Sequence, residues 1–192
     1  QHASYLAARE GLRGVQRMLE KKKSPYPRDV VHASARRVLM RLEVDLLTLS
    51  PPVPAQLVNI RLLLRWLEWQ LQSLKSTGAL RQRNALASVA ARLSTMATIV
   101  DAVVGDRELL DLTEEDWIDV ALEAMALIPR TYRSKKLMRA RLKAFHSYLR
   151  AHQSRPAALV PPVNWTTREL AVASVMAASP LLLPWEIEAV RS

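Results

Sequence analysis

The side chains in this sequence best suited to bind a ligand are the cations that follow residue 132. If residues 132–151 form an α-helix, side chains three, four or seven positions apart lie on one stripe. One such stripe consists of Lys136, Arg139, Lys143, His146 and Arg150. It is flanked by Arg133, Lys135 and Arg141. A row of cations of this length can follow a phosphate backbone or lie in a groove, so it predicts contact with nucleic acid.

The same segment carries an apolar face that can pack in a core. Met138, Leu142, Phe145 and Leu149 follow the spacing of one side of a helix. The bland alternative for the opposite side is a solvated charged face, but such faces usually mix signs. Residues 130–155 contain nine Lys and Arg and no Asp or Glu, which favours a nucleic-acid surface on which His146 is an exposed member.

A second group of cations lies earlier in the chain. Its members are Lys21, Lys22, Lys23, Arg36, Arg37, Arg41, Arg81 and Arg83. Each is a candidate phosphate contact, although the lysine run also fits a solvated helix end. A membrane surface is a third option, because basic amphipathic helices also lie on lipid. The regular apolar faces favour a bundle core instead.

Residue patterns for catalysis are nearly absent. The sequence has no cysteine, no glycine-rich phosphate loop, no histidine cluster and no nucleophile elbow, so we expect neither a cofactor nor a metal. Glu114, Glu115 and Asp116 are adjacent and suit the start of a helix better than acid–base work.

The overall charge points to a polyanionic partner. The net charge is +10, and all of that excess lies in residues 1–100, because the acids and bases of residues 101–192 balance. The lack of cysteine fits a reducing compartment, so we expect a cytoplasmic, nucleoid-associated protein. The apolar stretch Leu170–Trp185 is too short to span a bilayer, and no membrane association is expected.

Helical periodicity recurs along the whole chain, and no segment alternates with period two. It predicts helices near residues 4–23, 29–49, 55–75, 80–104, 113–128, 132–151 and 166–178, with a last one opening at Pro184. The fold class is therefore all-α, built from helical bundles.

The best-defined helix start is at Thr113. Its hydroxyl can accept a hydrogen bond from the amide of Asp116, whose carboxylate can reach back to the amide of Thr113. Leu112 and Trp117 are placed to pack as a hydrophobic staple, and Trp165 and Leu170 repeat that arrangement. Core packing is also the expected role of Trp66 and Trp69.

Three parts are predicted from the breaks between these segments. Residues 1–77 form an N-terminal helical module, and residues 79–155 a compact bundle, with Gly78 at the division. Residues 156–192, which contain Pro156, Pro161 and Pro162, form a linker and the start of a further domain.

Residues 80–153 resemble the core-binding domain of tyrosine recombinases, the phage-integrase family. That domain has an acidic L-x-x-L-T-x-x-D segment, read here in Leu109–Trp117, and a basic helix of the form R-x-x-L-x-x-F-x-x-Y-L, read here in Arg139–Leu149. Leu181–Ile187 resembles the L-L-x-P-x-E-I segment that opens the family's catalytic domain.

The resemblance implies a SAM-like, four-helix-type core-binding bundle in the second half of the chain. In that family the bundle and the catalytic domain close on duplex DNA as a clamp, and a tyrosine attacks the scissile phosphate without metal or ATP. By position, it implies DNA contacts from Lys135, Lys136, Arg139, Lys143, Arg81 and Arg83. The catalytic domain would follow Ser192. We interpret the H-x-x-R sequence at His152–Arg155 as chance, since no tyrosine lies downstream.

Two functions of different classes follow from these observations. In the first, the chain is the DNA-binding part of a site-specific recombinase, and it self-associates on DNA. In the second, it is a helical protein-interaction module without DNA binding, and its acidic residues 101–128 pair with the basic helix of another copy.

Overall fold

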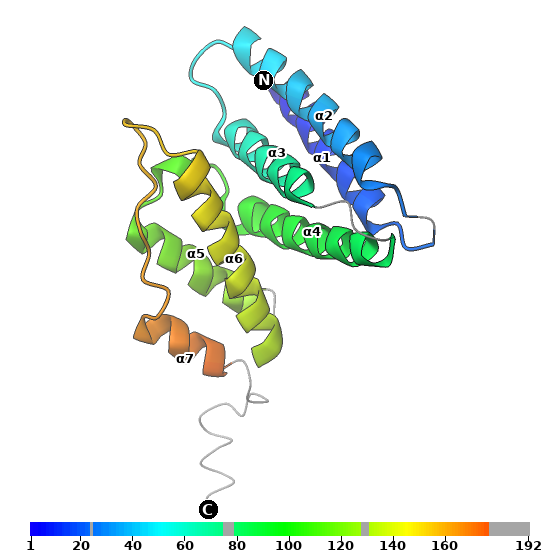
Figure 1. Cartoon of the computed structure of the whole chain (residues 1–192). Coiled ribbons are helices and arrows are strands. Elements are labelled where there is room, and N and C mark those ends of the chain that lie inside the picture. The colour runs from blue at the N-terminus through cyan, green and yellow to red at the C-terminus, as the bar shows by residue number, and fades with distance from the viewer. Residues whose placement is uncertain (24, 75–78, 128–130, 177–192) are drawn as a thin grey trace, which may run out of the picture. The chain divides into compact units, whose positions relative to one another are not determined.

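The computed structural model describes residues 1–23, 25–74, 79–127 and 131–176 (Figure 1). Within these ranges the chain is all-α, with seven α-helices and no strand, which confirms the predicted class. The segment Leu181–Ile187, the helix expected at Pro184 and Gly78 lie outside the described residues. The chain separates into two compact units, Gln1–Asp111 and Leu112–Ser192, which are described one at a time.

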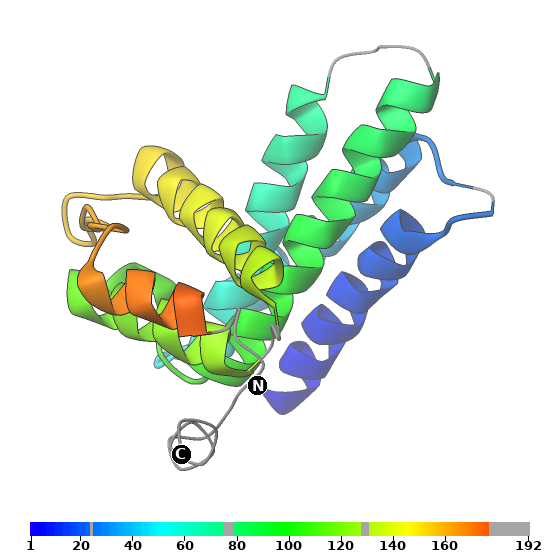
Figure 2. The same ribbon diagram turned by 90° about the horizontal axis from the view of Figure 1, so that it is seen from below.

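The first unit is a bundle of four α-helices (Figures 1 and 2). The helices are α1 (His2–Glu20), α2 (Arg28–Thr48), α3 (Ala55–Ser73) and α4 (Ala79–Ile99). Helix α3 contacts the other three, and α2 and α4 each pack against α1 as well. Helix α3 can occupy this central position because it is apolar nearly all round, which is the signature of a core helix. Its buried apolar side chains are Leu57, Ile60, Leu62, Leu63, Leu64, Trp66, Leu67 and Leu71.

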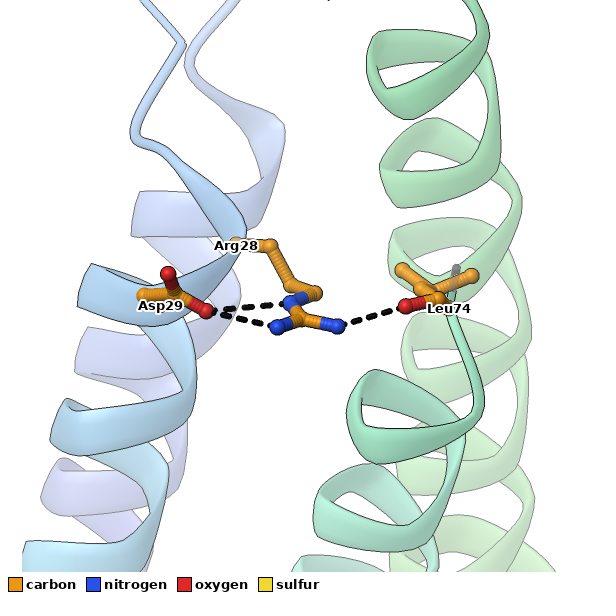
Figure 3. A network of polar contacts seen from close by, with 3 residues as sticks. All are labelled: Arg28, Asp29 and Leu74. Carbon is orange, nitrogen blue, oxygen red and sulfur yellow. Dashed lines mark hydrogen bonds and ion pairs between the residues drawn. The ribbon is translucent and has the colours of Figure 1, made fainter. Parts of the chain in front are cut away.

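Arg28 joins the start of α2 to the end of α3. Its Nη1 donates a hydrogen bond to the carbonyl oxygen of Leu74, while its Nε and Nη2 donate to Oδ1 of Asp29 at 3.1 and 2.8 Å (Figure 3). The planar guanidinium serves both partners because its donors are held in a fixed fork. The last turn of α3 therefore has an acceptor satisfied by a neighbouring helix.

Asn59 is a buried polar residue on α3 that fixes the segment after α4. Its Nδ2 donates to the carbonyl oxygen of Arg107 at 2.8 Å, and its Oδ1 accepts from the amide of Leu109 at 3.0 Å. A buried amide side chain of this kind is stable only because both ends are paired. Asn59 thus positions the 3₁₀ turn Leu109–Asp111 that closes the first unit.

Helix α4 continues into a π-helical turn, Val100–Val104, and ends at Gly105. Gly105 has φ 63° and its amide donates to the carbonyl oxygen of Val100 at 3.0 Å, which confirms the predicted helix stop. By length and composition, the helical segment Arg81–Val104 is long and apolar enough to cross a membrane. However, 44% of its most apolar stretch is buried inside the fold. Buried residues such as Leu93 and Met96 are those expected of a core helix that packs on α1 and α3.

The second unit contains α5 (Glu114–Leu127), α6 (Tyr132–His152) and α7 (Arg168–Met176). Each of the three contacts the other two. Their shared core holds Trp117, Val120, Ala124, Met125, Met138, Leu142, Phe145, Leu149 and Leu170. The predicted apolar face of residues 132–151 is therefore confirmed as the buried side of α6.

The predicted cap of α5 is present in full. The amide of Asp116 donates to Oγ1 of Thr113 at 3.1 Å, and the amide of Thr113 donates to Oδ2 of Asp116 at 2.9 Å. Leu112 and Trp117 are both buried, as the staple requires. Helix α6 has a cap that the sequence analysis missed, because the amide of Ser134 donates to Oγ1 of Thr131 at 3.1 Å.

The compact units differ from the predicted domains. Helix α4 belongs with α1–α3, because its apolar side completes their core, so the four-helix bundle lies in the first half of the chain. The bundle predicted for residues 79–155 is split between the two units at Asp111 and Leu112. A turn such as Thr77-Gly78 ends a helix, but only the pairing of apolar faces decides which helices share a core.

The contact between α1 and α2 generates a stability prediction. A Cβ placed on Gly11 would lie 2.6 Å from Cγ1 of Val38, whereas a Cβ on Gly14 would meet only the end of Arg17 at 3.9 Å. Gly14→Ala should therefore raise stability by about 0.5–1 kcal/mol through helix propensity alone. Gly11→Ala should lower it, since overpacking costs about 1–3 kcal/mol and valine is stiff.

Thermal unfolding followed by circular dichroism measures both effects. In a Val38→Ala background the crowding is relieved, and Gly11→Ala should then be stabilising. Equal stabilisation by Gly11→Ala and Gly14→Ala in the unmodified chain would show that the helices do not approach at Gly11.

Candidate nucleic-acid interface

Four cations of helix α6 lie on one side of the helix, away from its core residues. Lys136, Arg139, Lys143 and Arg150 fall within a strip about 60° wide on the helix surface, at about 100° per residue. From the first to the last, the strip is about 21 Å long, at about 1.5 Å of rise per residue. We call these four residues the α6 basic strip.

The members of the α6 basic strip differ in exposure. Lys136, Lys143 and Arg150 are exposed, whereas Arg139 is half-buried. Of the three predicted flanking cations, Arg133 is exposed, whereas Lys135 and Arg141 are half-buried. The strip therefore offers three exposed cationic side chains and one that is half-buried.

Carboxylates do not neutralise this surface in the described part of the chain. None of Lys136, Arg139, Lys143 and Arg150 forms an ion pair with a described carboxylate. In the second unit, Arg139 donates from Nη1 to Oγ of Ser174 at 3.4 Å, a neutral partner on α7 that itself donates to the carbonyl oxygen of Leu170 at 2.8 Å. This contact orients the guanidinium without cancelling its charge, so its positive charge remains available to an anion.

The expectation that His146 is exposed is wrong. Its side chain is 3% exposed, and its ring packs edge-on against Trp117 and Trp165, with centroids 4.9 and 5.4 Å away. Its Nε2 lies 2.8 Å from the carbonyl oxygen of Pro161. A carbonyl only accepts, so Nε2 carries the proton and donates. On the helix surface, His146 lies between the apolar face and the basic strip. Its ring is buried because it packs against Trp117 and Trp165.

Burial sets the protonation of His146. Desolvation lowers the pKa of this imidazole, an effect that its hydrogen bond to Pro161 partly offsets and that the charge of Arg150 reinforces. The neutral ring is the form that the apolar surroundings favour. His146 therefore anchors the segment after α6 and contributes no charge to the strip.

That segment is packed, although it was predicted to be the start of a linker. Val160 is buried, its amide donates to Oγ of Ser154 at 3.1 Å, and the amide of Asn164 donates to Oε1 of Glu114 at 3.1 Å. The prolines of this segment stop α6 but do not release the chain. Residues 153–167 instead run back along the second unit and bring α7 against α5 and α6.

The predicted contacts in the first unit lie on two separate helices. Arg36 and Arg37 are exposed on α2, and Arg81 and Arg83 are exposed at the start of α4. Arg41 is also exposed on α2, and Lys21–Lys23 follow α1, where Nζ of Lys21 lies 4.9 Å from the centre of the Tyr26 ring. Within this unit the structure therefore provides three small cationic groups, and none of them forms a strip like that of α6.

The tryptophans mostly serve the core. Trp66 and Trp117 are buried and Trp165 is half-buried, as predicted. Trp69 is exposed, so its predicted core role is wrong. It lies at the edge of the apolar stripe of α3, beyond the side that neighbouring helices cover.

An open groove of about 340 Å³ also lies in the first unit. It lies between α1, α3 and the π-helical turn, and Arg9 and Asp101 approach to 3.7 Å at its edge. No cluster of metal-binding side chains occurs among the described residues. The groove holds no arrangement of nucleophile, base and orienting group, so α6 stays the stronger candidate site.

Comparison with protein-family models, with curated proteins and with solved structures gives no match for this chain. The likeness to core-binding domains thus depends on the residue motifs themselves.

The environment of His146 predicts how stability changes with pH. The folded-state pKa lies below the unfolded value, so the neutral ring contributes stability that is present above about pH 6.5 and is lost as the pH falls through the folded-state pKa. Unfolding temperatures between pH 7.5 and 5 should therefore fall further for the unmodified chain than for His146→Gln, whose amide can still donate to Pro161. Identical pH profiles for the two proteins would contradict this assignment. His2 and His152, both exposed, are unchanged in both proteins and serve as internal controls.

Proposed function

We propose that this chain is the DNA-clamping part of a site-specific tyrosine recombinase, and that it grips duplex DNA through α6. The observation that carries the proposal is the α6 basic strip: a row of cations on a helix whose other side is fixed in a core. A rigid row loses little conformational freedom on binding, and each phosphate contact releases condensed counterions.

The cations of the first unit add to the same function. Arg36, Arg37, Arg81 and Arg83 are exposed and can meet phosphates as α6 does. Such contacts position the protein on the duplex and do not read its sequence.

In the tyrosine recombinase family, the catalytic domain carries out the chemistry of strand exchange. The residue motifs at Leu109–Trp117 and Arg139–Leu149 support the family, and the buried apolar half of the second motif agrees with its use as a packing helix. We therefore expect the residues of that catalytic domain, namely spaced arginines, an H-x-x-R motif and a later tyrosine, in the reading frame beyond Ser192.

A second function is favoured by the exposed acids of α5. Glu114, Glu115, Asp119 and Glu123 are exposed, so a second copy could place its α6 basic strip against them. Light scattering separates the two functions, since a stable dimer with no affinity for DNA supports the second.

Binding to a fluorescent duplex, followed by anisotropy across a salt series, tests the DNA proposal. Affinity should fall steeply with salt, and Lys136→Ala, Arg139→Ala and Lys143→Ala together should weaken binding and flatten the slope of log K against log salt by about 2–3. The matched control removes the exposed cations Arg13, Arg17 and Arg92, which gives the same loss of charge.

The control should keep most of the affinity, because charge placement matters more than net charge. Salt-insensitive binding, or equal loss in both triple variants, would refute α6 as the interface. Circular dichroism of each variant checks that the helices are intact.

A further inference from the structure

Helix α2 carries a second apolar stripe on the side away from its own core. The stripe consists of Val30, Ala33, Arg37, Met40, Val44 and Leu47, which we call the α2 stripe. These positions alternate spacings of three and four residues, the pattern of the a and d positions of a heptad repeat. All six residues are exposed, and the relative exposures of Val30, Met40, Val44 and Leu47 are 45%, 60%, 60% and 86%.

The core of the first unit does not use this stripe. Helix α2 buries Val31, Ala35, Leu39 and Leu42 instead, and the helices that it packs against are α1 and α3. Single exposed apolar residues are common on proteins, but a continuous row at heptad spacing is the seam by which one helix packs on another. The α2 stripe is thus an unpaired helix–helix seam.

The charges beside the stripe decide what can cover it. Arg36 and Arg41 occupy flanking positions, and Arg37 lies within the seam. The flanking acid Glu43 is engaged on the other side, because its carboxylate lies 2.8 Å from Nη2 of Arg65 and 3.7 Å from Nη1 of Arg61. Asp29 is held by Arg28. Arg36 and Arg41 therefore border the seam as positive charges, and a partner with carboxylates at the facing positions would complement them.

We propose that α2 is a docking site for an acidic amphipathic α-helix of a partner protein. The partner helix would place apolar residues between Met40, Val44 and Leu47 and place Asp or Glu opposite Arg36, Arg37 and Arg41.

Other occupants fit the surface less well. A second copy of α2 in parallel orientation would bring Arg36 against Arg41. In the antiparallel orientation the carboxylate opposite Arg36 would have to come from Glu43, which Arg65 and Arg61 already hold. DNA can reach Arg36 and Arg37 from the side, but phosphates cannot cover Met40 and Leu47, so DNA contacts at these arginines leave the apolar seam open. A membrane suits a wide apolar face, whereas this seam is narrow and has Arg37 inside it.

The test uses the whole chain and two synthetic peptides of three heptads. Both peptides carry Leu at the a and d positions, and the e and g positions carry Glu in one peptide and Lys in the other. Fluorescence anisotropy should show binding of the Glu peptide and at least about tenfold weaker binding of the Lys peptide. Equal binding of both peptides, or binding of neither, would overturn the proposal.

Variants identify the surface that is used. Met40→Gln with Val44→Gln should weaken the Glu peptide at least about tenfold, since two apolar contacts are lost. The control, Leu127→Gln with Val172→Gln, removes two exposed apolar residues of the second unit and should leave binding unchanged. Arg36→Glu with Arg41→Glu should reverse the preference towards the Lys peptide.

Three results would assign the stripe to another occupant and overturn the proposal. The first is a dimer in sedimentation that is abolished by Met40→Gln with Val44→Gln. The second is flotation of the chain with anionic vesicles that the same double variant abolishes. The third is loss of duplex binding in that double variant. The inference does not depend on the DNA proposal, because the α6 variants should bind the Glu peptide normally.

Discussion

The second unit depends on the burial of one side of α6. Phe145 and Leu149 are completely buried, and α6 packs against α5 and α7. A helix that packs along one side must present its other side outward. Burying an aromatic and three aliphatic side chains contributes about 1.5–3 kcal/mol each, far more than surface repulsion among a few cations costs. Core packing therefore keeps Lys136, Lys143 and Arg150 in one row despite the repulsion between their charges.

Two polar side chains, those of His146 and Arg139, lie between the buried side and the exposed side of α6. His146 is neutral, donates to Pro161 and fills the space between two indole rings. Arg139 lies about two turns before His146 on α6, with the hydroxyl of Ser174 as its partner. The first group attaches the returning chain to α6, and the second keeps its charge available. Both are consequences of the same packing, and both leave the charged row intact.

Local signals in the sequence predicted local structure well. The reciprocal bonds between Thr113 and Asp116, and the end of a helix at residue 104, were predicted because caps and helix ends depend on residues within one turn. The apolar face of α6 was predicted for the same reason, since periodicity within one helix determines which residues share a side.

Features that depend on distant residues were not predicted. Helix α4 joins the first unit because its apolar side completes a core formed by α1 and α3, and no signal near Gly78 records this. His146 is buried because Trp117 and Trp165 come together around it, and these residues are far apart in the sequence. Its position between the apolar face and the cations of α6 was a signal that His146 could be buried. The surrounding positive charges instead led to the prediction that it is exposed.

The central claim is that duplex DNA lies along the outward side of α6. The chain has no cysteine, so a single cysteine at Ser147, which is exposed beside the α6 basic strip, can carry a photo-crosslinker without removing a cation. A matched probe at Val172, exposed on α7, serves as the comparison. Crosslinking to duplex DNA should be strong from Ser147→Cys, weak from Val172→Cys, and abolished by high salt. Equal crosslinking from both positions, or none from Ser147→Cys while DNA is bound, would contradict the account.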